Sequence, residues 1–198
     1  MDDTFLTLKE ESEGLYKEKG SKFLAFAYPV NDEEEIKEKL EALRKKYYDA
    51  RHHCYAYILG KEKENYRAND DGEPNHSAGD PILGQIRSND LTNVLIVVIR
   101  YFGGTKLGVG GLITAYKTAA AEAIISNEII TEIVTKKIKF TFDYLDMNDV
   151  MRLIKEFELE IKGQNFDNSC SMTIKVREGN YDQVLYRLNE ISSVNILD

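Results

Sequence analysis

The stretch from Asn93 to Ser126 constrains the fold more than any other part of the chain. It opens with Val94–Ile99, a run of only Val, Leu and Ile, which is typical of a strand covered on both faces. Glycines then crowd positions 103–111, and after them apolar and small residues recur at helical spacing as far as Ile124. The pattern predicts a buried strand, a glycine-rich loop and a helix.

The glycine-rich loop has a charge pattern that favours an anion. No Asp or Glu occurs from Leu91 to Ala121, although the chain contains 34 of them. A helix start offers free N–H groups and the positive end of the helix dipole. The competing interpretation is that the small residues only let the helix pack closely on a sheet. We predict contact with an anion or a nucleic-acid backbone through Arg51, Arg100, Gly103, Gly104, Lys106, Gly108, Gly110, Gly111 and Lys117.

Composition limits the class of protein. The 198 residues allow one large domain or two small ones. No apolar run is long enough to cross a membrane and the acidic start lacks the features of a signal peptide, so we expect a cytoplasmic protein. Cys54 and Cys170 lie far apart, which indicates reduced core thiols. The net charge of −8 argues against a protein that coats nucleic acid in general, but it allows a local basic groove.

Residues 1–130 are expected to form one α+β domain. Residues 12–29 indicate a hairpin, and Asn31 or Asp32 then begins a helix with a glutamate three residues on, as in a capping box. Alternation predicts strands at 52–59 and 65–69. A short helix with Pro81 in its first turn should precede the central strand.

Residues 136–198 are expected to form a second domain, after a charge-bearing link at 127–137. Apolar periodicity predicts a strand, a helix, two strands, a helix and a last strand, with a turn at 165–168. The order β-α-β-β-α-β is that of a ferredoxin-like fold. The sequence therefore predicts a two-domain α+β protein.

A turn-rich acidic segment before the central strand supplies a second set of candidate site residues: Asp70, Asp71, Glu73, His76 and Ser77. Their polarity is opposite to that of the glycine-rich loop, so we predict that the two loops meet in space. The histidines and cysteine at 52–54, taken with this segment, match no compact zinc spacing, and we assign no metal ligands.

Two other kinds of site compete at these residues. A nucleophile among Cys54, Ser77 and Thr105 lacks a recognised signature, so no catalytic residue is assigned, although the acids could hold a divalent ion beside a phosphate. The other is a groove in which Tyr101 or Phe102 stacks against a base. Strand alternation puts Arg100 and Phe102 on one face and Tyr101 on the other.

Two long motifs make the chain recognisable. The stretches YRANDDGEPNHSAGDPIL and LTNVLIVVIRYFGGTKLGVGGLITAY resemble the IMPACT/YigZ family, and the C-terminal part resembles the extra domain of its bacterial YigZ branch. The resemblance implies a first domain like the second domain of ribosomal protein S5 and a second like the last domain of elongation factor G. One departure is His76, which stands where the family commonly has a small residue, while Ser77 keeps a hydroxyl.

The resemblance also implies a class of function. Eukaryotic IMPACT proteins regulate translation, by competing for a ribosome-associated activator of a stress kinase. We therefore predict a non-enzymatic protein that binds RNA, the ribosome or a ribosome-associated protein, with no cofactor and no membrane partner. The alternative is a magnesium-dependent enzyme acting on a phosphorylated small molecule or nucleotide. A third hypothesis is an adaptor that binds only protein.

Overall fold

The computed structural model describes residues 3–166 and 170–197. Its contacts divide the chain into two compact units. We call Phe5–Glu132 the N-terminal unit, and we call the unit that begins at Ile133 and includes Asp3 and Thr4 the C-terminal unit. Both units contain helices and antiparallel strands, so the chain is an α+β protein as predicted.

The N-terminal unit is built on a five-stranded antiparallel sheet. Its strands follow the order β2 (Ser12–Glu18), β3 (Ser21–Pro29), β6 (Val94–Tyr101), β4 (His52–Leu59) and β5 (Asn65–Asn69). The predicted hairpin of residues 12–29 is confirmed as β2 and β3. The predicted central strand is confirmed as β6, the middle strand of the sheet.

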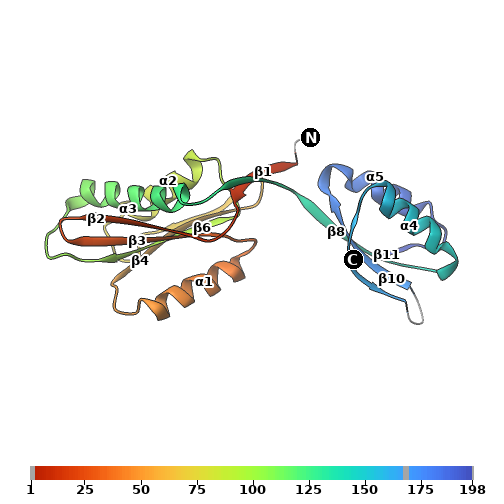
Figure 1. Ribbon diagram of the computed structural model, residues 1–198, viewed down its shortest axis with the longest axis horizontal. Helices are drawn as coiled ribbons and strands as arrows, with labels where there is room; N and C mark the ends of the chain where they lie inside the picture. Colours follow the sequence, from red (N-terminus) through yellow and green to blue (C-terminus); the bar gives the residue numbers. More distant parts are fainter. Residues whose placement is uncertain (1–2, 167–169, 198) are drawn as a thin grey trace. The chain divides into compact units, whose positions relative to one another are not determined.

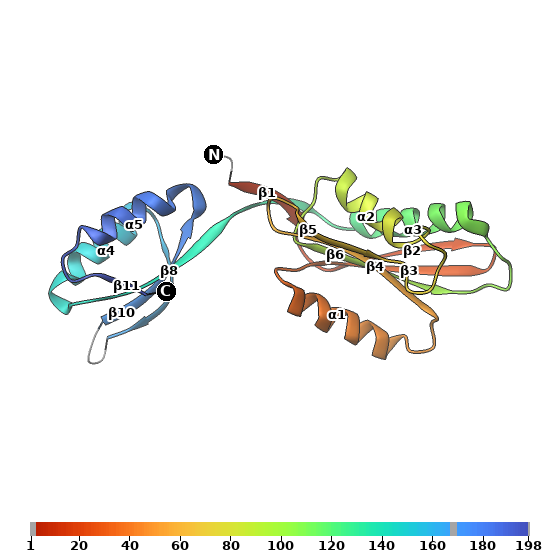
Figure 2. The same ribbon diagram turned by 180° about the vertical axis from the view of Figure 1, so that it is seen from behind.

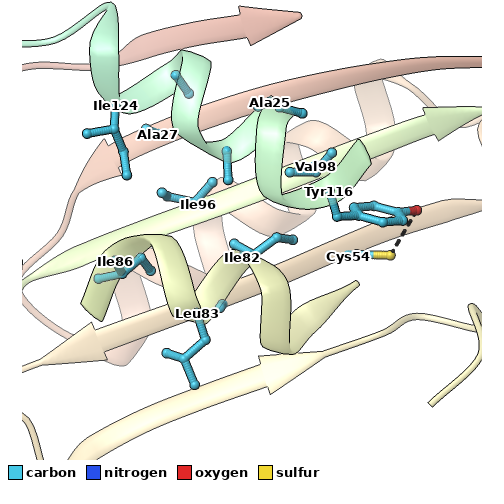
Figure 3. Close-up of a cluster of buried hydrophobic side chains, with 14 of the residues drawn as sticks. Ala25, Ala27, Cys54, Ile82, Leu83, Ile86, Ile96, Val98, Tyr116 and Ile124 are labelled. Carbon is cyan, nitrogen blue, oxygen red and sulfur yellow. Dashed lines mark hydrogen bonds between the residues drawn. The ribbon is translucent and has the colours of Figure 1, made fainter. Parts of the chain in front are cut away.

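Helices cover both faces of this sheet, as Figures 1 and 2 show. Helix α1 (Glu33–Lys46) lies on one face, and α2 (Gly79–Ser88) and α3 (Gly108–Ile125) lie on the other. Alternate residues of β6 therefore enter two separate cores: Ile96 and Val98 pack under α2 and α3 (Figure 3), whereas Leu95 and Val97 pack against α1. This double burial explains why β6 is an unbroken apolar run.

The start of α1 shows how local sequence sets an element boundary. The Asp32 carboxylate accepts a hydrogen bond from the backbone N–H of Glu35 at 2.9 Å. The Glu35 carboxylate in turn accepts one from the backbone N–H of Asn31 at 2.8 Å. Asp32 is therefore the cap, as predicted, while Glu35 bonds back to the residue before the cap and not to the cap itself, which is a variant of the predicted capping box.

One predicted connection is wrong. Residues 127–137 were expected to be a link, but Ile129–Ile133 forms β7, which pairs with β1 (Thr4–Leu8), and β8 already begins at Thr135. Strand β7 is mostly exposed, so it lacks the alternation of buried and exposed positions that reveals a strand in a sequence.

The C-terminal unit has the predicted element order β-α-β-β-α-β. Its elements are β8 (Thr135–Phe142), α4 (Met147–Glu156), β9 (Glu160–Asn165), β10 (Cys170–Arg177), α5 (Tyr181–Asn189) and β11 (Asn195–Leu197). The strands form an antiparallel sheet in the order β11-β8-β10-β9. Helices α4 and α5 pack on one face of it, over Ile138, Phe140 and Met172. Part of the predicted turn at 165–168 lies outside the described residues.

A buried aspartate ties the chain's first described residue into the C-terminal unit. The Asp3 carboxylate accepts hydrogen bonds from Arg177 Nε at 2.7 Å, from Arg177 Nη2 at 2.6 Å and from the backbone N–H of Gly179 at 3.0 Å. The hydrogen bonds from the Arg177 guanidinium are the main reason that the pKa of Asp3 lies well below its usual range.

The lowered pKa of Asp3 predicts a pH-dependent contribution to stability. We expect Asp3→Asn to destabilise the C-terminal unit at neutral pH. The difference from the parent protein should be complete above the pKa of an unfolded aspartate, about 3.9, and should shrink as the pH falls toward the folded-state pKa. Urea unfolding of both proteins at several pH values between 7 and 3 measures it. A difference that grows on acidification would contradict the assignment.

Candidate functional site

A cleft of about 720 Å³ opens in the N-terminal unit where the end of β6, the start of α3 and the acidic loop meet. Six side chains that define it are Arg51, Glu73, Arg100, Phe102, Lys106 and Val109. The glycine-rich and acidic loops therefore meet in space, as predicted from their polarity.

A buried ion pair forms the floor of the cleft. Arg100 Nη1 donates to Glu73 Oε1 at 2.7 Å, and both residues are only 8% exposed. The Tyr116 hydroxyl donates to the same carboxylate oxygen at 2.7 Å. His52 Nε2 lies 4.0 Å from Glu73 Oε2. Glu73 thus organises side chains from β4, β6 and α3.

Arg100 was predicted to be an open contact for an anion, but in the structure it is buried and paired. Its charge is paired with Glu73, and its guanidinium lies 5.6 Å from the ring centres of both Phe23 and Phe102. Its Nε atom has no hydrogen-bond partner among the described residues. The ion pair was not predicted from the sequence. The signal that could have revealed it is that a charged arginine at the end of a strand buried on both faces requires a counter-charge.

Tyr101 and Phe102 lie on opposite faces, as the alternation predicts. Phe102 stands beside Arg100 and is 57% exposed. The Tyr101 hydroxyl instead donates to Asp49 Oδ1 at 2.7 Å. Both rings line the cleft, but Tyr101 is half-buried, so Phe102 presents the more exposed ring to a ligand.

Cys54 and Tyr116 extend the buried network behind the cleft (Figure 3). The Cys54 thiol lies 3.0 Å from the carbonyl oxygen of Asp70 and 3.4 Å from the Tyr116 hydroxyl. Burial raises the pKa of the Cys54 thiol and that of Tyr116 above their ordinary values. Cys54 is a free, buried thiol and stays protonated at neutral pH, which agrees with the predicted core role.

The two aspartates of the acidic loop hold backbone groups. Asp70 Oδ1 accepts from the N–H groups of Ala78 at 3.0 Å and Gly79 at 2.8 Å, at the start of α2. Asp71 Oδ2 accepts from the N–H of His53 at 2.7 Å. The magnesium hypothesis requires these carboxylates to face a ligand, whereas both accept hydrogen bonds from the backbone and neither lines the cleft. Within residues 3–166 and 170–197, no group of three or more His, Cys, Asp or Glu side chains is arranged to hold a metal ion.

His76 and Ser77 do not line the cleft. The Ser77 hydroxyl is buried and donates to the carbonyl of Pro74 at 2.5 Å. His76 has a φ of 63°, a left-handed conformation that favours glycine, and its Nδ1 lies 2.5 Å from Asp80 Oδ2. The loop therefore keeps a conformation suited to a small residue even with histidine at this position.

The predicted anion-contact residues separate into groups. Arg51, Lys106 and Gly108 line the cleft with Arg100. The remaining predicted residues, Gly103, Gly104, Gly110, Gly111 and Lys117, do not line it. Gly110 and Gly111 line a smaller hollow of about 250 Å³ beside the β2–β3 hairpin. The apolar lining residues Pro74, Leu107 and Leu112 lie within the two family motifs, but they were not among the predicted contact residues, because no charge marked them.

The start of α3 at the cleft carries no acidic side chain. Leu107 occupies the cap position and makes no capping hydrogen bond from its side chain. Gly108, with a φ of 72°, begins the helix. The first N–H groups of α3 therefore leave the positive end of its dipole uncompensated by a side chain at this edge.

The family model of the Impact N-terminal domain matches residues 19–124, which include the whole cleft. The chain belongs to the IMPACT family. IMPACT family member YvyE of Bacillus subtilis is 30% identical over 88% of this chain and 81% of its own length. IMPACT family member YigZ of Escherichia coli is 30% identical over 75% of this chain and 74% of its own length.

A solved structure described as a hypothetical protein has the same fold as this chain. It has a TM-score of 0.76 and 23% identity, and the match covers 100% of this chain and 98% of that one. Among the helices that the structure describes, none is both long and apolar enough to cross a membrane.

Proposed function

We propose that this IMPACT-family protein binds single-stranded RNA through the cleft, as a cytoplasmic, non-enzymatic participant in translation. One unstacked base lies against Phe102, and the adjoining phosphates contact Arg51 and Lys106. The observation that carries this proposal is the exposed Phe102 ring at a cleft that is also lined by two cationic side chains. Aromatic stacking beside basic groups is the common mode of binding single strands.

The buried ion pair supports Phe102 in this role. The Arg100 guanidinium lies 5.6 Å from the centre of the Phe102 ring, so it backs the ring instead of contacting phosphate. In this proposal Arg51 and Lys106 contact the phosphates, and Arg100 does not. The start of α3 adds a favourable dipole at the same edge of the cleft.

The link to translation rests on family membership. The eukaryotic members of the family regulate translation, so the ribosome or a ribosome-associated protein is the proposed setting for the RNA contact. The proposed likeness of the two units to the second domain of ribosomal protein S5 and the last domain of elongation factor G agrees with that setting. Burial keeps the Cys54 thiol protonated, which argues against Cys54 as a nucleophile.

Replacing Arg51 and Lys106 together by alanine should weaken binding to a 20-nucleotide oligouridylate by about tenfold or more. Each lost phosphate contact on a single strand should also reduce the slope of log affinity against log salt by about 0.7. Phe102→Ala should weaken binding by about 1–3 kcal/mol with little change in that slope. Fluorescence anisotropy at several salt concentrations measures both quantities.

The matched control removes two exposed lysines that do not line the cleft, Lys37 and Lys155, so the net charge changes by the same amount. An equal loss of affinity in this control would show that net charge, and not the cleft, determines binding. Affinity for RNA that does not depend on salt would contradict the phosphate contacts. In the native host, comigration with ribosomes should decrease in the double variant.

A further inference from the structure

The sheet of the C-terminal unit has one face that its own helices do not cover. Ile138, Phe140 and Met172 point to the face on which α4 and α5 pack. Side chains alternate along a strand, so the residues between them point to the opposite face. On β8 and β10 these include Lys137, Lys139, Thr141, Ser171, Thr173 and Lys175.

The register brings two lysines directly together on this uncovered face. Lys137 on β8 lies opposite Lys175 on β10, and Lys139 lies opposite Thr173. Like charges at opposite positions of an antiparallel pair are destabilising. Lys137 and Lys139 are exposed, and Lys175 is half-buried. The pairing of Lys137 with Lys175 by itself is therefore unfavourable for the sheet.

Few acids compensate this charge. In the described part of the chain, neither Lys137 nor Lys139 forms an ion pair. Glu160 on β9 lies opposite Lys175 and attracts it, but the nearer partner of Glu160 is Lys162 at 2.5 Å, so one carboxylate serves two lysines. The cationic face is unusual in a protein whose net charge is −8.

We propose that the uncovered face of the C-terminal sheet, centred on Lys137, Lys139 and Lys175, is a second RNA-binding surface that contacts the phosphate backbone. It is independent of the cleft, because it lies in the other unit and shares no residue with it. Its charge is complementary to a polyanion. Two residues along a strand span about 6.6 Å, so the lysines can serve successive groups of an extended chain.

The side chains beside these lysines indicate contact with the RNA phosphate backbone and no sequence-specific contact with the bases. Thr141, Ser171 and Thr173 offer short hydroxyl donors, which commonly contact phosphate. Sheet surfaces that read RNA bases do so with exposed aromatic rings. None of the described residues on this face of β8 and β10 is aromatic. Binding here should therefore depend strongly on salt and only weakly on nucleotide sequence.

The test uses the full chain and a 20-nucleotide oligouridylate in fluorescence anisotropy. Replacing Lys137, Lys139 and Lys175 by glutamine should weaken binding by about tenfold or more and reduce the salt slope by about 2, since each phosphate contact on a single strand contributes about 0.7. The matched control replaces three exposed lysines elsewhere, Lys37, Lys45 and Lys155, by glutamine. It should retain most of the affinity.

Further arms separate the possible outcomes. Equal losses in the test and control variants would overturn the inference, as would an unchanged salt slope in the test variant. Stronger binding to phosphatidylserine vesicles than to RNA would assign the face to membranes and would also overturn it. Parallel measurement of the Arg51→Ala, Lys106→Ala variant separates the two sites. Normal RNA binding by that variant would refute the cleft proposal alone.

A stability measurement checks the physical premise separately. Lys175→Thr removes the like-charge pair with Lys137 and places a β-branched residue in β10. We expect its Tm to be higher than that of the parent, while its RNA affinity is lower. A lower Tm would mean that Lys175 stabilises the fold, and the argument from unfavourable charge placement would fail.

Discussion

Replacing Glu73 by alanine is expected to lower the free energy of unfolding of the N-terminal unit by about 3–5 kcal/mol. The change leaves the guanidinium of Arg100 buried without a counter-charge, and it removes the acceptor of the Tyr116 hydroxyl. A buried charge without a partner is among the most destabilising features a single substitution can create. Equilibrium urea unfolding, followed by far-ultraviolet circular dichroism, measures the effect.

Two further variants isolate the ion pair as the cause. Glu128→Ala breaks the exposed pair with Lys9 in the same unit and should cost less than about 1 kcal/mol. The double variant Glu73→Gln, Arg100→Met should recover part of the loss, because it removes the buried charge itself. A cost below about 1 kcal/mol for Glu73→Ala would show that water or a neighbouring group compensates Arg100.

Replacing Gly103 by alanine is expected to destabilise the N-terminal unit by about 3 kcal/mol or more. A Cβ atom at this position would lie 1.9 Å from the carbonyl carbon of Gly20 and 2.2 Å from the backbone nitrogen of Ser21. Both atoms belong to the backbone of the β2–β3 turn, so no side chain can rotate away. To make room for the Cβ atom, the turn would have to move away from the end of β6. Thermal and urea unfolding measure the loss.

Gly110→Ala is the matched control for Gly103→Ala. Apart from its chain neighbours and the backbone of its own helix, no atom lies within 4 Å of a Cβ built at Gly110, which occupies the first turn of α3. Alanine favours a helix over glycine by up to about 1 kcal/mol, so this variant should be equal to or more stable than the parent. If both variants destabilise the protein by the same amount, backbone overlap is not the reason at Gly103.

Much of the fold follows from local sequence patterns. The apolar run at 94–99 predicted a strand buried on both faces, and both of its cores are present. Asp32 and Glu35 predicted the start of α1. These predictions succeeded because each depends on neighbouring residues whose spacing is fixed by the element itself.

The predictions that failed depend on partners far along the chain. Strand β7 pairs with β1, from the other end of the N-terminal unit, and its exposed residues show no periodicity. Arg100 pairs with Glu73, which lies 27 residues before it. Charge and glycine content indicated which loops would meet, but they could not tell a buried ion pair from an open cationic site. The roles of Arg51, Lys106 and the other candidate residues stay predictions.

The β1–β7 pairing has a consequence for the order of folding during synthesis. The backbone N–H of Lys9, directly after β1, donates to the carbonyl of Glu128, and these residues are 119 positions apart. At synthesis rates of about 5–20 residues per second, roughly 6–24 s separate the two. The whole five-stranded sheet emerges in that interval. Strand β1 can pair with Leu91 and Thr92 as soon as they emerge, but its edge toward β7 stays unpaired until the chain has nearly reached the C-terminal unit.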